Sequence, residues 1–315
     1  MSQEINEQTA LEQSEPLPFP FNQRTFCPYE TIEKRIETVR VLVIDDLLRD
    51  ERDLSESAHA EWGASAKTHL ARERHIASLA IENIVNNIKR LVREPETQVA
   101  HVSEIAEVAA EFRPQAIVLS GTLRDFDYYN PEIFESFERF IQTTQIPVLG
   151  ICGGHQLIGM AFGANVLTLD NREPLERRDG RPFEYQYRFI RITAPNDPIF
   201  QGINDRESGV WQDYTTEARI LRVWQNHGLQ LDRIPEGFSL LATAYLCRTQ
   251  MMVRRTGEQL IYTVQFHLEK SFEDWNKNRT RWEHLNESRD GRILFENFLR
   301  EAIKRTTDDG QPTTG

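Results

Sequence analysis

Short apolar runs alternate with longer segments of helical periodicity through the first half of the chain. In each run Val, Ile and Leu follow one another, which is typical of a strand buried on both faces of a sheet. The runs predict strands at 40–45, 116–120 and 146–151. Between them, apolar residues recur at helical spacing over about 68–92, and a proline opens a second predicted helix over 131–143.

A further strand and helix are predicted between the first two runs. Residues 98–102 favour a strand, and Ser103 is expected to cap a helix that continues to about Phe112. Strands separated by helices predict a mostly parallel, doubly wound α/β sheet.

The pattern changes after Gly163, where strand-like runs follow one another with few helices between them. These runs lie at 185–192, 220–224, 238–246 and 260–266. They predict an antiparallel extension of the same sheet, and an amphipathic helix over 292–304 closes the pattern.

Three regions follow from this organisation. Residues 1–37 are acidic, contain several prolines and lack a sustained period, so we expect a disordered N-terminal extension. Residues 38–305 form one predicted domain, and residues 306–315 are expected to be a flexible tail.

Charge and cysteine content narrow the class of protein. The net charge is −12, and an acidic chain lacks the basic face that nucleic acid or an anionic membrane requires. Three widely spaced cysteines do not suggest a disulfide framework, and no membrane span or secretory leader is visible. We therefore expect a cytoplasmic protein.

An acidic pair at the end of the first predicted strand resembles the start of a phosphoacceptor receiver domain. That fold would place another Asp after the third strand, but Ser120-Gly121-Thr122 stands there. Asp45 and Asp46 are therefore expected to end the strand and cap the loop that follows.

The strongest local signal is Gly150-Ile151-Cys152-Gly153-Gly154-His155-Gln156, between an apolar strand and an apolar helix. A tight turn at such a junction presents one side chain at the carboxyl end of the sheet. Backbone N–H groups at the start of the helix favour a thiolate there. The pattern predicts Cys152 as a nucleophile; the alternative is a buried structural cysteine.

A cysteine nucleophile requires a base, and the segment Gln265-Phe266-His267-Leu268-Glu269 offers one at the end of a predicted strand. In an extended segment Glu269 points to the same side as His267 and can orient the imidazole. A histidine two residues before a glutamate is a weak signal alone, but the cysteine turn strengthens it.

Together these two segments resemble the class I, or triad, glutamine amidotransferases over roughly residues 40–304. The resemblance implies a flavodoxin-like fold and a triad of Cys152, His267 and Glu269. We expect no cofactor, and no metal because no cluster of His, Cys and carboxylate residues has the spacing of zinc ligands. Leu268 departs from the family, in which Pro usually separates the His from the Glu.

The resemblance also implies a pocket for the γ-glutamyl group. Gln156 lies one helical turn after the cysteine and would help to hold the substrate. The segment containing Asn226, Gly228 and Leu229 resembles the family's clamp on the α-amino and α-carboxylate groups. The alternative for that segment is an ordinary turn with a left-handed glycine.

An oxyanion hole is implied at the N–H groups of Gly153 and Thr122. Many family members have Ser-Gly-Gly-Pro in the loop that carries the second donor, whereas this chain has Ser-Gly-Thr-Leu-Arg-Asp from Ser120 to Asp125. Thr122 can still donate, provided that its backbone does not require a positive φ.

Three functions remain open. The first is a glutaminase that supplies ammonia to a separate synthase, since this chain contains no phosphate-binding loop. The second is a γ-glutamyl hydrolase or peptidase with the same triad, which the Thr122 loop favours. The third is a catalytically silent scaffold. For a synthase partner, the acidic extension and the Trp-bearing segment 270–289 are candidate docking surfaces.

Overall fold

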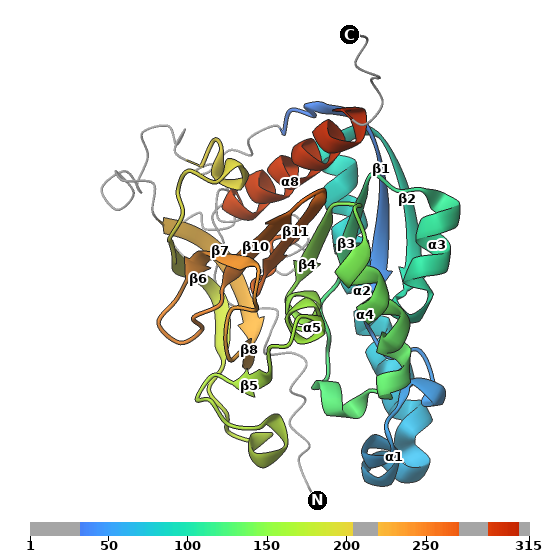
Figure 1. The fold of residues 1–315 in the computed structure, drawn as a ribbon. Helices are drawn as coiled ribbons and strands as arrows, with labels where there is room; N and C mark the ends of the chain where they lie inside the picture. The colour runs from blue at the N-terminus through green and yellow to red at the C-terminus, as the bar shows by residue number, and fades with distance from the viewer. Residues whose placement is uncertain (1–31, 204–219, 271–288, 309–315) are drawn as a thin grey trace, which may run out of the picture.

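The structure, a computed structural model, describes residues 32–203, 220–270 and 289–308, and its strands build a central sheet with helices on both faces (Figure 1). In this part of the chain the sheet has nine strands. Its parallel half is ordered β2 (Val92–His101), β1 (Ile36–Asp45), β3 (Ala116–Leu119), β4 (Val148–Ile151) and β11 (Gln259–Val264). The predicted α/β sheet is confirmed.

Antiparallel pairings extend the sheet beyond β11, as predicted. The strands follow in the order β10 (Met251–Thr256), β9 (Phe238–Thr243), β6 (Glu184–Ile192) and β7 (Ile220–His227). Two short strands, β5 (Val166–Thr168) and β8 (Leu229–Leu231), form a separate antiparallel pair.

Helices cover the two faces of the parallel strands. The α-helices are α1 (Glu56–Trp62), α2 (Ala66–Leu91), α3 (Ile105–Phe112), α4 (Glu135–Thr143), α5 (Gly153–Ala161) and α8 (Arg289–Asp308). Short 3₁₀ turns lie at Glu51–Asp53, Gly63–Ser65, Val102–Glu104, Phe126–Tyr128, Pro131–Phe134, Pro174–Arg177 and Pro198–Phe200. Within these ranges no helix has both the length and the apolar character needed to cross a bilayer.

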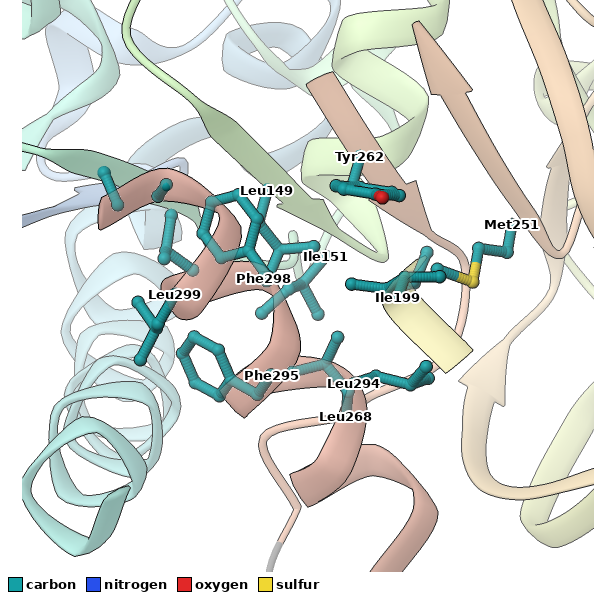
Figure 2. Close-up of a cluster of buried hydrophobic side chains, with 14 of the residues drawn as sticks. Leu149, Ile151, Ile199, Met251, Tyr262, Leu268, Leu294, Phe295, Phe298 and Leu299 are labelled. Carbon is teal, nitrogen blue, oxygen red and sulfur yellow. The ribbon is translucent and has the colours of Figure 1, made fainter. Parts of the chain in front are cut away.

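Two apolar layers hold the helices to the sheet. Val41 and Val43 of β1 belong to a layer with α8 and the second half of α2, whereas Leu42 and Ile44 belong to a layer with α3, α4 and α5. Side chains of β1 therefore alternate between the layers, as a strand buried on both faces requires. Figure 2 shows the α8 layer, in which Phe298 packs against β4.

Three local predictions differ from the structure. The turn Val102–Glu104 has His101 as its N-cap, whose side chain accepts from the Ser103 N–H, so Ser103 is not the predicted cap. The strand predicted at 238–246 ends at Thr243, and β10 was not predicted. Consecutive arginines near the end of β10 interrupt the apolar run by which a strand is identified.

The carboxyl ends of the parallel strands meet at one edge of the sheet. Ser120 follows β3, Cys152 follows β4 and residues 265–269 follow β11. In doubly wound folds this edge holds the ligand. The predicted triad and the loop of Thr122 thus lie at the same edge, while residues 1–31, 271–288 and 309–315 lie outside the described part.

Candidate active site

Cys152 occupies a strained turn between β4 and α5. Its φ is 51° and its ψ is −102°, a conformation that L-residues rarely adopt and that costs on the order of 1–3 kcal/mol. The Cys152 N–H donates to the Val264 carbonyl at 2.8 Å, which ties the turn to β11. The side chain is 6% exposed. Strain at a functional turn is expected where it presents one side chain.

The glycines after Cys152 are required for space rather than for a positive φ. A Cβ on Gly153 would lie 2.4 Å from the Thr122 nitrogen, and one on Gly154 would lie 2.7 Å from the Leu119 Cβ. The Gly154 N–H donates to the Ser120 carbonyl at 2.9 Å. The start of α5 therefore contacts the backbone of the loop after β3, with the Thr122 nitrogen against Gly153.

Gly153→Ala is expected to lower kcat by on the order of 10²–10³-fold, because the new methyl group must displace Thr122. Steady-state kinetics measures the loss. Gly163→Ala, just beyond the carboxyl end of the same helix, is the control: a Cβ there meets nothing within 4 Å, but φ is +85°. The control should lose about 1 kcal/mol of stability and no activity. Equal kcat in both variants would contradict this prediction.

His267 and Glu269 are hydrogen-bonded at the end of β11. The His267 Nδ1 lies 2.7 Å from the Glu269 Oε1, and the His267 N–H donates to the Trp224 carbonyl at 2.8 Å. A Cβ built on Gly121 would lie 3.4 Å from both the Cys152 Cβ and the His267 Cε1, so the imidazole lies close to the cysteine. Among the described residues the His267 Nε2 has no hydrogen-bond partner.

Charge sets the protonation of this pair. Burial lowers the pKa of His267, but the Glu269 carboxylate and the Cys152 sulfur more than offset burial and raise the pKa to about 10. Burial alone would raise the pKa of Glu269, but the neighbouring imidazolium has the opposite and larger effect, so the pKa of Glu269 is lowered. The arrangement therefore favours an imidazolium beside an ionised carboxylate.

Neighbouring elements fix the segment from His267 to Glu269. The Asn87 side chain of α2 donates to the Glu269 carbonyl, and Gly291 of α8 lies against the Leu268 backbone. The Leu268 side chain is buried in the layer that includes α8 (Figure 2). Leu268, the departure from the family pattern, thus anchors this segment by packing against α8.

Glu269→Gln should lower the pKa of His267 below about 10, because it removes the carboxylate that stabilises the imidazolium. The stability that His267 gains from its raised pKa is complete below its ordinary value of 6.5 and is lost as the pH rises through about 10. Glu269, with a lowered pKa, contributes above its ordinary value of 4.5 and loses this contribution as the pH falls. The difference in unfolding free energy between the two proteins should therefore be largest between pH 4.5 and 6.5.

NMR titration of the imidazole and denaturant unfolding across pH measure both effects. Glu258→Gln provides a control on the same chain, since its carboxylate is not among the groups that influence His267. An unchanged pKa of His267 in Glu269→Gln would contradict the proposed coupling.

The loop after β3 is fixed at Ser120, which is fully buried. The Ser120 Oγ accepts from the Asp46 N–H at 3.1 Å and donates to the Gly121 carbonyl at 3.2 Å. A trans peptide points its C=O and its N–H in opposite directions, so holding the Gly121 carbonyl also orients the Thr122 N–H. Thr122 is not among the positive-φ residues of the described chain, so threonine meets the backbone condition stated for it.

The acidic pair lies behind this loop. The Asp45 Oδ1 accepts from the Leu47 N–H at 3.1 Å, as expected of a residue that ends a strand. Burial, with Asp45 adding its charge, raises the pKa of Asp46 well above its ordinary range. Burial therefore disfavours the charged form of Asp46, whose backbone N–H donates to the Ser120 Oγ.

Gln156 lies in a buried chain of amides that reaches the cysteine. Its Nε2 donates to the Gln265 Oε1 at 3.0 Å and to the Leu229 carbonyl at 3.3 Å, while the Gln265 Nε2 lies 3.7 Å from the Cys152 Sγ. The structure thus brings Gln156 and Leu229, two residues of the predicted pocket, into contact. The sequence analysis did not identify Gln265 as a site residue. Its position two residues before His267 indicates that both side chains point to the same side of an extended segment.

The segment with Asn226 and Gly228 is not a left-handed turn. Strand β7 continues through His227, β8 begins at Leu229, and Gly228 is not among the positive-φ glycines. Asn226 is exposed, whereas His227 is held through both ring nitrogens. The His227 Nδ1 donates to the Leu229 carbonyl at 2.9 Å, and its Nε2 lies 3.2 Å from the Glu184 carboxylate.

In residues 32–203, 220–270 and 289–308, no group of three or more His, Cys, Asp and Glu side chains is placed as metal ligands would be.

The sequence and the fold of this chain are similar to those of known proteins. Residues 79–285 match the family described as glutamine amidotransferase class-I. One subunit of the glutamine-hydrolysing GMP synthase of Methanothermobacter thermautotrophicus is 25% identical over 217 residues, which cover 68% of this chain and 88% of that protein. The subunit of the same name from Pyrococcus furiosus is 32% identical over 172 residues, which cover 54% of this chain and 74% of that protein.

Longer relatives and a solved structure are also similar. The glutamine-hydrolysing GMP synthase of Pyrobaculum aerophilum is 30% identical over 227 residues, but the match covers only 35% of its length. The crystal structure of a putative GMP synthase subunit from Thermoplasma acidophilum has a TM-score of 0.53 at 20% identity, and the match covers 87% of this chain and 98% of that chain. This likeness shows a shared fold.

Proposed function

The chain belongs to the class I glutamine amidotransferases, and from this we propose that it hydrolyses the side-chain amide of glutamine at Cys152 and supplies the ammonia to a separate synthase. The observation that carries the proposal is the strained turn at Cys152, with the hydrogen-bonded pair of His267 and Glu269 beside it. A nucleophile, a base and an orienting carboxylate at one edge of a sheet are the parts that acyl transfer requires.

The reaction proceeds in two halves. The Cys152 thiolate attacks the amide carbon, the His267 imidazolium gives its proton to the departing nitrogen, and ammonia leaves a γ-glutamyl thioester on the sulfur. His267, now neutral, takes a proton from water, which attacks the thioester and releases glutamate and the thiolate. Glu269 accepts from the His267 Nδ1 throughout and holds the ring in one orientation.

Backbone donors stabilise the charge that develops on the carbonyl oxygen. The N–H groups of Gly153 and Thr122 fill this role because the two backbones are in contact and Ser120 orients the Thr122 peptide. Gln156 and the segment from Asn226 to Leu229 hold the rest of the γ-glutamyl group. Gln265, between Gln156 and the sulfur, links the pocket to the nucleophile.

The lengths of the matches support a separate synthase. This chain covers most of the two shorter relatives, which are named as subunits, but only 35% of the longer GMP synthase. Their naming as subunits supports an acceptor for ammonia on another chain. Passing ammonia directly between chains avoids its protonation in water.

A γ-glutamyl hydrolase is the second candidate, and the loop from Ser120 to Asp125 favours it. The family resemblance predicts Gly-Pro where this loop has Thr-Leu, and Leu123 is an exposed apolar side chain beside the predicted oxyanion donor. An apolar group there would suit the leaving group of a γ-glutamyl conjugate.

Substrate preference separates the two candidates. Ammonia and glutamate release from glutamine, and amino acid release from a panel of γ-glutamyl dipeptides, are measured with the purified chain. Our proposal predicts a higher kcat/KM for glutamine than for every dipeptide. A higher kcat/KM for a dipeptide would overturn it in favour of the hydrolase, and Cys152→Ala serves as the blank for both activities.

A further inference from the structure

An ion pair joins the loop of Thr122 to the segment before β6. The Asp125 carboxylate receives both arms of the Arg181 guanidinium: Nη1 lies 2.8 Å from Oδ2 and Nη2 lies 2.9 Å from Oδ1. Arg178 also approaches Asp125, with its Nη1 3.9 Å from Oδ2, and pairs with Asp127. Asp125 ends the same loop that begins at Ser120, so Thr122 lies between two fixed points.

Arg181 also contacts the predicted substrate clamp. A Cβ on Gly228 would lie 2.9 Å from the Arg181 Nε and 3.3 Å from the Pro182 carbonyl oxygen. Arg181 therefore makes two contacts: its guanidinium binds the Asp125 side chain of the Thr122 loop, and it packs directly against the backbone of Gly228. Arg181 thus connects the predicted oxyanion loop to the predicted clamp.

The pair has the geometry and burial of a positioning element. The Asp125 side chain is 9% exposed and that of Arg181 is 20% exposed, so water screens the charges little. A bidentate guanidinium–carboxylate pair fixes distance and orientation together. The loop from Ser120 to Asp125 contains no proline, and the ion pair at Asp125 anchors it a second time, besides the hydrogen bonds of Ser120.

We propose that Arg181 and Asp125 are positioning residues that hold the Thr122 N–H and the backbone of Gly228 at fixed positions relative to each other. This proposal deepens the proposed function and rests on it. Neither side chain touches the reacting atoms. Arg181 acts on the transition state through Asp125 and Thr122, and on the ground state of the substrate through Gly228.

The two arms predict separate kinetic effects. Asp125→Asn breaks the arm to Thr122 and should lower kcat with little change in KM, because an oxyanion donor acts mainly in the transition state. Arg181→Gln breaks both arms and should lower kcat and raise KM. A displacement of the order of an ångström costs about 10²-fold in kcat/KM, which is the loss expected for Arg181→Gln.

Coupling tests the mechanism more closely. In Gly228→Ala the new Cβ must displace Arg181, so this variant should lose much of its activity in the native background and less in Arg181→Gln. The double variant of Arg181→Gln and Asp125→Asn should be no worse than Arg181→Gln alone. Additive losses in both pairs would overturn the proposal.

The matched control is Arg255→Gln. Arg255 also contacts two carboxylate oxygens, with its Nη2 3.0 Å from each Asp197 oxygen. However, it lies on β10 opposite Leu260, near the amino end of β11 and so away from the site at the carboxyl end of β11. It should lose stability without loss of kcat/KM. If Arg181→Gln does not fold, Arg181→Lys, which keeps the charge but loses the bidentate fork, replaces it and should show a smaller loss of the same kind.

Unchanged kinetics in folded Arg181→Gln or Arg181→Lys would overturn the positioning role. Cys152→Ala distinguishes this failure from failure of the proposed function. If Cys152→Ala is inactive while the Arg181 variants are fully active, only the positioning role is wrong. If Cys152→Ala remains active, the proposed function itself is wrong.

Discussion

Cys152→Ala is expected to lower kcat for glutamine hydrolysis by about 10⁴-fold or more, the largest effect of any single change in the chain. Without the sulfur no thioester forms, and the remaining groups can only assist direct attack by water. Alanine also removes few contacts, since Cys152 lies at a turn whose backbone is held by the Val264 carbonyl. Ammonia release and thermal unfolding, measured together, separate loss of chemistry from loss of fold.

Cys247→Ala is the control for this variant. Cys247 is fully buried, and burial raises the pKa of its thiol to about 12, so it is not ionised at neutral pH. We expect Cys247→Ala to keep its activity and to lose modest stability from the small cavity. Inactivation by Cys247→Ala with activity retained in Cys152→Ala would reverse the assignment of the nucleophile.

His267→Asn is expected to cost nearly as much in kcat as Cys152→Ala. Asparagine can keep a hydrogen bond to Glu269, but it can neither protonate the departing nitrogen nor take a proton from water. It also removes the positive charge of the imidazolium beside Cys152. Steady-state kinetics across pH measures both consequences, because the loss of the general acid and base should flatten the pH profile.

The double variant tests whether the two residues act as one unit. Cys152→Ala combined with His267→Asn should be no slower than Cys152→Ala alone, because the histidine has no thiolate or thioester left to serve. Glu258→Gln, on the surface between β10 and β11, should leave kcat unchanged. A further large loss in the double variant would show that His267 acts independently of Cys152.

Buried strands and the turn at Cys152 could be predicted from the sequence because local physics determines them. A strand covered on both faces requires consecutive apolar residues, and the residues from Val41 to Ile44 meet that requirement. Their side chains point alternately into the two apolar layers. There is likewise no space for a side chain at Gly153 and Gly154, so the two glycines in the sequence indicate that other atoms approach the backbone closely there.

Contacts between distant segments could not be predicted in the same way. Asn87 reaches the Glu269 carbonyl from α2, and Arg181 reaches Asp125 from the segment before β6. Neither contact can be predicted from the local sequence, because no sequence pattern indicates which distant residue a long polar side chain will contact. Gln265 was within reach of spacing arguments, yet its role depends on Gln156, which only the fold brings to it.

The most direct test of the central claim is the covalent labelling of the full chain by a glutamine analogue that carries an electrophilic diazoketone in place of the side-chain amide. Peptide mapping by mass spectrometry locates the label, and excess glutamine serves as the competitor. We predict one label per chain, on Cys152, that glutamine suppresses and that Cys152→Ala abolishes. A label on another residue, or labelling of Cys152 that glutamine does not slow, would contradict the proposed role of Cys152.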